Sequence, residues 1–127
     1  MHELSLVTGV ISICTDTISR HPGKRISKVV LEIGSLSGVD MPSFEFAWKR
    51  AVPGTVLEGA TAEINEVTAR AKCTDCGMDF EISNLYDPCP GCGGYFRRIY
   101  QGDKMNVKYI EVEDAGMRED LLTGQKN

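Results

Sequence analysis

The sequence predicts an α+β protein: a two-layer domain of two helices on a small sheet of about three strands, with an inserted four-cysteine module like a zinc ribbon. Three observations predict this fold. Two segments carry apolar residues at helical spacing, three segments are rich in β-branched residues, and two Cys-x-x-Cys pairs lie between the last two of those segments. A chain of 127 residues can bury one moderate core, so any second unit must be small.

The first helix is expected over residues 4–20, before His21-Pro22-Gly23 ends it. Its predicted apolar face consists of Leu4, Val7, Ile11, Cys14 and Ile18, widened by Leu6, Val10 and Ile13. A second, short helix is expected to start after Asp40, a suitable N-cap ahead of Pro42, and to stop at Pro53-Gly54. Its helical spacing is carried by Phe44, Ala47, Trp48 and Ala51.

Three strands are expected, over Ile26–Ile33, Thr61–Ala69 and Met105–Val112. In the first of them, alternation predicts one well-buried face. The last two strands bracket the cysteines, so the cysteine segment is interpreted as an insertion. The predicted division is an α/β domain of residues 1–70 and 103–113, a zinc-binding module of residues 71–102, and a polar tail of residues 114–127.

The cysteine module has the ligand spacing of a metal site. Each Cys-x-x-Cys turn can present two thiolates to one ion, and a glycine after each pair, Gly77 and Gly93, permits a tight turn. A redox dithiol fits less well, because it needs only one pair inside a βαβ pattern, and a catalytic zinc fits less well, because four cysteines leave no open coordination position. Iron held by the same four thiolates remains an alternative. The predicted structural zinc ligands are Cys73, Cys76, Cys89 and Cys92.

The chain begins Met1-His2-Glu3, where an α-amine, the His2 amide nitrogen and the His2 imidazole lie within chelating reach of one ion. Planar, nitrogen-rich ligand sets suit Ni(II) or Cu(II), and Glu3 could add a carboxylate or an amide. Taken alone, a histidine in second position is more often an ordinary solvated residue. The other histidine, His21, is expected to be a solvated helix-end residue, and Cys14 a buried small hydrophobe.

Composition excludes several classes of function. The formal net charge of −4 argues against nucleic acid as a partner, and the absence of a long apolar run or a signal-like start predicts a cytoplasmic protein without a membrane segment. The sequence has two histidines and neither a phosphate-binding loop nor a dinucleotide-binding glycine pattern, so an enzyme is not expected. Whether the chain is a monomer or a homodimer is left open.

Four stretches together resemble the HypA/HybF hydrogenase nickel-incorporation family over residues 1–113. They are the opening Met-His-Glu-Leu-Ser-Leu, the segment Leu31–Asp40, the two cysteine pairs, and the segment Gln101–Val112. The resemblance implies that His2, and with it Glu3, binds nickel, and that the four module cysteines bind zinc. It also implies delivery of nickel to the large subunit of NiFe hydrogenase, together with a HypB-type GTPase.

Some members of that family are thought to draw a further histidine ligand from the zinc module, whereas this chain has Arg97-Arg98 in the corresponding stretch. These arginines also support an alternative function, a zinc-ribbon module that binds protein or nucleic acid. The aromatic residues beside them are Tyr95, Phe96 and Tyr100.

Overall fold

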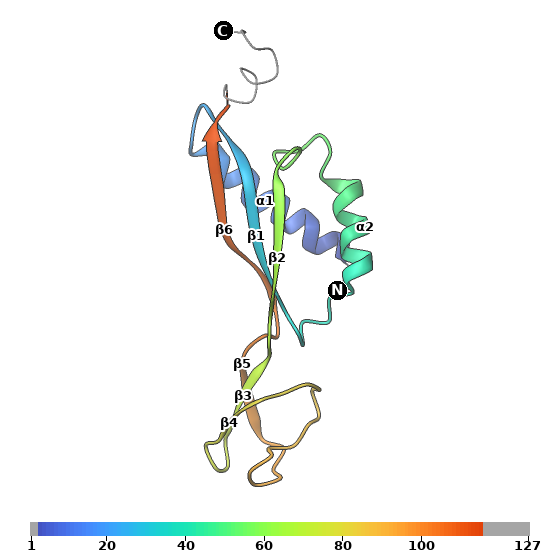
Figure 1. The fold of residues 1–127 in the computed structure, drawn as a ribbon, viewed down its shortest axis with the longest axis vertical. Coiled ribbons are helices and arrows are strands. Elements are labelled where there is room, and N and C mark those ends of the chain that lie inside the picture. The colour runs from blue at the N-terminus through green and yellow to red at the C-terminus, as the bar shows by residue number, and fades with distance from the viewer. Residues whose placement is uncertain (1–2, 116–127) are drawn as a thin grey trace. The chain divides into compact units, whose positions relative to one another are not determined.

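The computed structural model describes residues 3–115 and contains two helices and two three-stranded sheets (Figure 1). The predicted α+β class is therefore confirmed. The elements are α1 (Glu3–Ser19), β1 (Lys24–Gly34), α2 (Met41–Ala51), β2 (Thr61–Val67), β3 (Arg70–Cys73), β4 (Asp79–Glu81), β5 (Arg97–Gln101) and β6 (Met105–Asp114). The sheets have the strand orders β2-β1-β6 and β4-β3-β5.

These elements form two compact units. Of the described residues, the first unit contains 3–30, 40–63 and 107–115, and the second contains 31–39 and 64–106. The second unit includes all four cysteines of the predicted module, together with the loop that follows β1.

Helix α1 is amphipathic as predicted, but its buried stripe is narrower than the sequence suggested. Val7, Val10 and Cys14 are buried, whereas Leu4 is 53% exposed and Ile13 is 50% exposed. The prediction was wrong for these two side chains. Ile13 points about 100° around the helix axis from its neighbour Cys14, which takes it off the stripe, and Leu4 lies in the first turn at the helix end.

Helix α2 begins at the predicted cap and packs against α1. The Asp40 side chain accepts a hydrogen bond of 3.1 Å from the backbone N–H of Ser43, which satisfies one of the free donors of the first turn. Phe44 is buried, and its ring centroid lies 5.9 Å from that of Trp48. The chain turns away at Gly54, whose φ of +84° explains why glycine stands there.

Strand β1 is the central strand of its sheet, and it is buried more completely than alternation predicted. Val29, Val30 and Leu31 are all fully buried, although strict alternation puts Val30 on the opposite face from Val29 and Leu31. Both faces of the strand are therefore shielded from solvent at this point.

The start of β1 and the end of β6 are held together by charge. Lys24 pairs with Asp114 and Arg25 with Glu113, and the N–H of Ala115 donates to the Gly23 carbonyl over 2.8 Å. β6 therefore includes Asp114, where the polar tail was predicted to begin. The rest of that tail, 116–127, lies outside the described residues.

The second unit has a small core of its own. Strand β3 pairs antiparallel with both β4 and β5, and the side chains of Phe80 and Ile82 are buried. The strand expected to end at Ala69 instead stops at Val67, and Ala69 joins this core. The cluster consists of Ala69, Ala71, Cys73, Phe80, Ile82 and Cys89, with Leu36 and Ile99 packed against it.

Three backbone segments cross at very short range beside this core. A Cβ atom on Gly34 would lie 2.1 Å from the carbonyl oxygen of Gly102, and one on Gly102 would lie 2.3 Å from Cα of Ala69. Only glycine therefore fits at positions 34 and 102. The Leu36 N–H donates a hydrogen bond of 2.8 Å to the Gly102 carbonyl. This bond fixes the loop after Gly34 and brings the Leu36 side chain to the cluster.

The two phenylalanines of α2 provide a matched test of the first unit's core. Phe44 is 1% exposed and Phe46 is 63% exposed. We expect Phe44→Ala to lower the free energy of unfolding by about 3–5 kcal/mol, because it removes a buried ring and leaves a cavity. Phe46→Ala should cost about 0.5 kcal/mol, as for a surface position. Denaturant unfolding followed by the fluorescence of Trp48 measures both, and equal losses would contradict this description of the core.

Candidate metal centre

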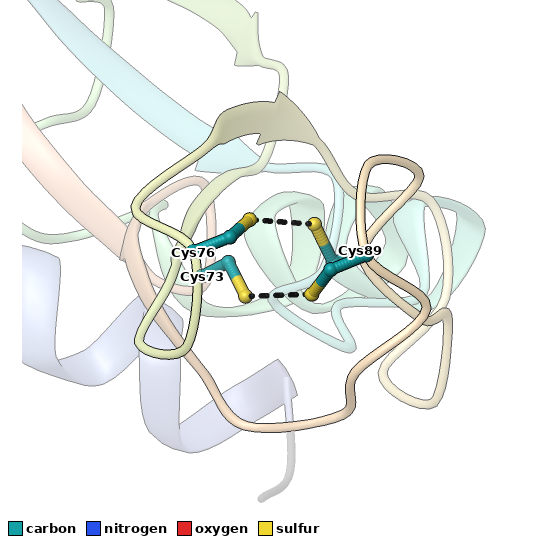
Figure 2. A group of neighbouring side chains, drawn as sticks. Cys73, Cys76 and Cys89 are labelled. Atoms are coloured by element: carbon teal, nitrogen blue, oxygen red, sulfur yellow. Dashed lines mark hydrogen bonds between the residues drawn. The ribbon is translucent and has the colours of Figure 1, made fainter.

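The four module cysteines converge on one point. Their Sγ atoms all lie within 4.8 Å of one another, and Figure 2 shows the side chains of Cys73, Cys76 and Cys89 pointing toward a common centre. The shortest distances run between the two pairs, 3.6 Å from Cys73 Sγ to Cys92 Sγ and 3.7 Å from Cys76 Sγ to Cys89 Sγ. Residues thirteen or more positions apart in the chain therefore share one site.

The sulfur distances fit a tetrahedral ion. Zinc–sulfur bonds of about 2.3 Å in a regular tetrahedron place neighbouring sulfur atoms about 3.8 Å apart. The observed separations of 3.6 and 3.7 Å agree with this value. A disulfide needs about 2.05 Å, so neither of these contacts is a disulfide. The donor set is suited to a thiophilic cation such as zinc.

Both pairs adopt the same backbone turn. In the first, Cys73 N–H donates to the Met78 carbonyl over 2.8 Å, and Gly77 N–H donates to the Cys73 carbonyl over 2.9 Å. In the second turn, Cys89 N–H donates to the Gly94 carbonyl and Gly93 N–H donates to the Cys89 carbonyl, each over 2.8 Å. The predicted need for glycine after each pair is confirmed by the φ angles, +81° at Gly77 and +76° at Gly93.

Backbone amides point at the sulfur atoms and shift their acidity. Gly91 N–H lies 3.4 Å from Cys89 Sγ. The N–H of Cys76, above all, lowers the pKa of Cys73 to about 7. At Cys92 the Gly94 amide favours the thiolate, but hydrogen bonding to Cys73, desolvation and the other thiols raise its pKa to about 12. The Cys73 thiolate therefore forms readily. Four thiolates this close together repel one another, so a bound cation is needed for all four to be deprotonated.

Two further glycines in the second pair were missed by the sequence analysis. A Cβ on Gly94 would lie 2.8 Å from the Asp75 carboxylate and 3.3 Å from Cys92 Sγ, and one on Gly91 would lie 2.7 Å from Met78 Sδ. A side chain at either position would displace the end of the neighbouring Met78 or Asp75 side chain beside the sulfur atoms. The glycine-rich run around Cys92 was a signal that could have identified them.

A polar network across the module sheet was also missed. The Tyr100 hydroxyl donates to the Asp79 carboxylate over 2.8 Å, and the Arg70 guanidinium donates to the same carboxylate, also over 2.8 Å. A register shift between Arg70 and Ala71 makes Tyr100 the extra residue of a β-bulge, which directs its ring across the strand. No spacing in the sequence indicates such a bulge.

Of the predicted nickel-site residues, His2 lies outside the described residues and Glu3 opens α1. The Glu3 carboxylate accepts a hydrogen bond of 3.0 Å from the backbone N–H of Asp40. This bond is the main reason that the pKa of Glu3 lies below its usual value. The structure thus places Asp40 beside the start of the helix, a proximity across thirty-seven positions that the sequence did not indicate.

The remaining candidate residues take no part in the four-cysteine centre. Cys14 is buried in the first unit, and burial raises the pKa of its thiol to about 11, as suits a small hydrophobe. His21 is exposed in the turn after α1. Over the described part of the chain, neither helix is long and apolar enough to cross a bilayer.

The fold and the centre define a small α+β protein that carries a tetrathiolate metal-binding module. Comparison with known proteins agrees with this class. The family model described as "Hydrogenase/urease nickel incorporation, metallochaperone, hypA" matches residues 1–112. The chain is 42% identical over 113 residues to "Hydrogenase maturation factor HypA" of Geobacter metallireducens, covering 89% of this chain and 100% of that protein. It is 44% identical over 110 residues to the protein of the same name from Francisella philomiragia, covering 87% and 97%.

Solved structures are similar as well. One is described as the solution structure of the Ni metallochaperone HypA from Helicobacter pylori, with a TM-score of 0.66, 26% identity, and coverage of 87% of this chain and 97% of that one. Another, a solution structure of HypA protein, has a TM-score of 0.69, 28% identity, and coverage of 90% and 98%. The chain belongs to the HypA family. This is a family of nickel metallochaperones and hydrogenase maturation factors, not of enzymes.

The Tyr100 hydrogen bond predicts a measurable change in acidity. The Tyr100 hydroxyl, followed by Arg70, lowers the pKa of Asp79 by stabilising its carboxylate. We expect Tyr100→Phe to raise that pKa toward its ordinary value of about 3.9. The carboxylate stabilises the folded module above its unfolded-state pKa, and this contribution disappears as pH falls through the folded-state pKa. Carbon-detected NMR titration of Asp79 gives the shift directly.

The matched control is Tyr86→Phe, because Tyr86 is 84% exposed and belongs to no such network. This substitution should leave the Asp79 titration unchanged. A Tyr100→Phe titration that coincides with that of the unmodified protein would show that the hydroxyl does not act on Asp79.

Proposed function

We propose that this chain is a nickel metallochaperone that binds Ni(II) at its N-terminus and delivers it for maturation of the large subunit of NiFe hydrogenase, with a structural zinc in its module. The observation that carries the proposal is the family match, which begins at residue 1 and so includes Met1-His2-Glu3 as well as both cysteine pairs. The relatives' shared name, hydrogenase maturation factor, supports the choice of target.

The proposed zinc is structural because its four ligands, Cys73, Cys76, Cys89 and Cys92, leave no coordination position for a substrate. The buried cluster around the module cysteines is small, with two alanines and two cysteines among its six members. Metal binding can supply the folding energy that such a core lacks. Iron would suit the same geometry, so the metal has to be identified by analysis.

The proposed nickel ligands are His2, through its imidazole and amide nitrogen, and Glu3. The hydrogen bond from Asp40 and the lowered pKa of Glu3 support this role, because they keep a carboxylate deprotonated and fixed at the start of α1. Nickel is the cargo. A chelate of few residues at a chain start can release its ion more readily than a closed set of four thiolates, which is what delivery requires.

Transfer requires partners. We propose a HypB-type GTPase and the hydrogenase large subunit, working in the cytoplasm. The sequence has no phosphate-binding loop of its own, so nucleotide hydrolysis would belong to the partner.

Zinc content tests the module. We expect one zinc per chain by elemental analysis, and its loss in Cys73→Ser, because a missing thiolate opens the coordination sphere. Amide hydrogen exchange should then increase throughout residues 64–106, while the first unit keeps its protection because it has a separate apolar core. Cys14→Ala is the control, since Cys14 is buried in the first unit and should not affect zinc. Full zinc content in Cys73→Ser, or iron in its place, would exclude the assignment.

Nickel titration tests the N-terminal site. We expect His2→Ala to weaken Ni(II) binding at least about tenfold, equivalent to about 1.4 kcal/mol, because it removes the imidazole ligand. Residues added before Met1 should weaken it similarly, since they displace the α-amine from the chelate. Glu3→Gln should have a smaller effect, because the amide oxygen can still accept the Asp40 N–H.

The matched control for this titration is His21→Ala, the other histidine of the chain, which is exposed in the turn after α1. Isothermal titration calorimetry of zinc-loaded protein should show no change for this variant. Equal affinities for His2→Ala and His21→Ala would place the nickel site elsewhere.

A further inference from the structure

The exposed face of the module sheet carries two cations directly opposite each other. Lys72 on β3 is the cross-strand partner of Arg98 on β5, and both side chains are exposed. Like charges in this arrangement repel and destabilise the pair. Among the described residues, the Arg98 side chain has no hydrogen-bonding or ionic partner. The structure therefore keeps an uncompensated positive charge at this position.

The acids nearest to this pair are already engaged. Asp79 stands opposite Lys72 on the other side of β3, but its carboxylate accepts from Arg70 over 2.8 Å and from Tyr100. Arg70 also lies 4.0 Å from Glu81. Because Asp79 already binds Arg70 and Tyr100, it balances Lys72 only in part, and no acid among the described residues pairs with Arg98.

An exposed aromatic ring adjoins the two cations. Phe96 precedes β5, and its carbonyl accepts the N–H of Thr74 over 2.9 Å, so the strand pairing extends to it. Side chains two positions apart on a strand share a face, which places Phe96 beside Arg98. The Phe96 side chain is 73% exposed. Phe96 therefore offers an accessible apolar contact beside the two cations.

We propose that this surface, formed by Lys72, Phe96 and Arg98, binds an acidic peptide segment of a partner protein. Carboxylates of the segment would pair with Lys72 and Arg98, and one apolar side chain would cover Phe96. A peptide fits better than nucleic acid, because the surface offers only a pair of cations. Binding to nucleic acid draws on many phosphate contacts. The proposal is independent of the nickel site.

The test uses zinc-loaded, full-length protein and two short fluorescent peptides rich in aspartate and glutamate, one with a central phenylalanine and one with glycine in its place. Anisotropy titration at low salt should show binding of the phenylalanine peptide. Arg98→Glu should raise its Kd about tenfold, since it reverses one of the two charges. Lys72→Gln should raise it less. Lys49→Glu, an exposed lysine on α2, is the matched control and should bind like the unmodified chain.

The contribution of Phe96 is isolated by a double-mutant cycle. Phe96→Ala should weaken binding of the phenylalanine peptide and leave the glycine peptide unaffected. Retention of zinc in every variant shows that the module is intact. The proposal is overturned if neither peptide binds, if Arg98→Glu and Lys49→Glu bind equally, or if a single-stranded oligonucleotide of similar length binds more tightly than the phenylalanine peptide. Nickel titrations of the same variants should be unchanged, which separates this surface from the proposed delivery site.

Discussion

The second unit depends on bringing four sulfur atoms to one point. Among the described residues, the buried cluster around the cysteines has two large side chains, Phe80 and Ile82, and such a cluster is too small to offset the loss of chain entropy on folding. Two turns with matching backbone hydrogen bonds bring the sulfur atoms together, and the proposed zinc would supply the missing folding energy. Backbone amides lower the pKa of Cys73, so this one thiolate is stabilised before any cation arrives. The rest of the module follows from this convergence, including the glycines that leave space beside the sulfur atoms.

The proposed function divides two demands on metal chemistry between two parts of the chain. A structural ion has to stay, and a closed set of four thiolates with no open position favours that. A cargo ion has to leave, and a short chelate at the start of α1, beside a carboxylate that is held by the Asp40 N–H, favours exchange. The lowered pKa of Glu3 keeps that carboxylate charged without burying it, so a partner can still reach the site.

Periodic features were predictable from the sequence, and contacts between distant residues were not. The helices, the three strands β1, β2 and β6 and the cysteine spacing follow local rules, and the structure confirms them, whereas the short strands β3, β4 and β5 were not predicted. The bulge that turns Tyr100 toward Asp79, and the approach of Asp40 to Glu3, depend on how separate segments come together. The exposure of Leu4 and Ile13 shows a related limit, since periodicity gives the direction of a side chain but not how far the covering layer extends.

Two of the stretches that resemble the HypA family contain no metal ligand of the module. The crossing of Gly34, Gly102 and Ala69 gives these stretches a structural role instead. Leu31–Asp40 and Gln101–Val112 are far apart in sequence, yet Gly34 lies so close to the backbone of Gly102, and Gly102 so close to the backbone of Ala69, that neither glycine can carry a Cβ. The hydrogen bond from Leu36 to Gly102 then fixes the loop, and its side chain covers the module core beside the buried cysteines. A substitution at Gly34 would force the two backbones apart and withdraw Leu36 from that core. The glycines of these stretches are therefore fixed by the geometry that supports the metal site, although they touch no metal ligand themselves.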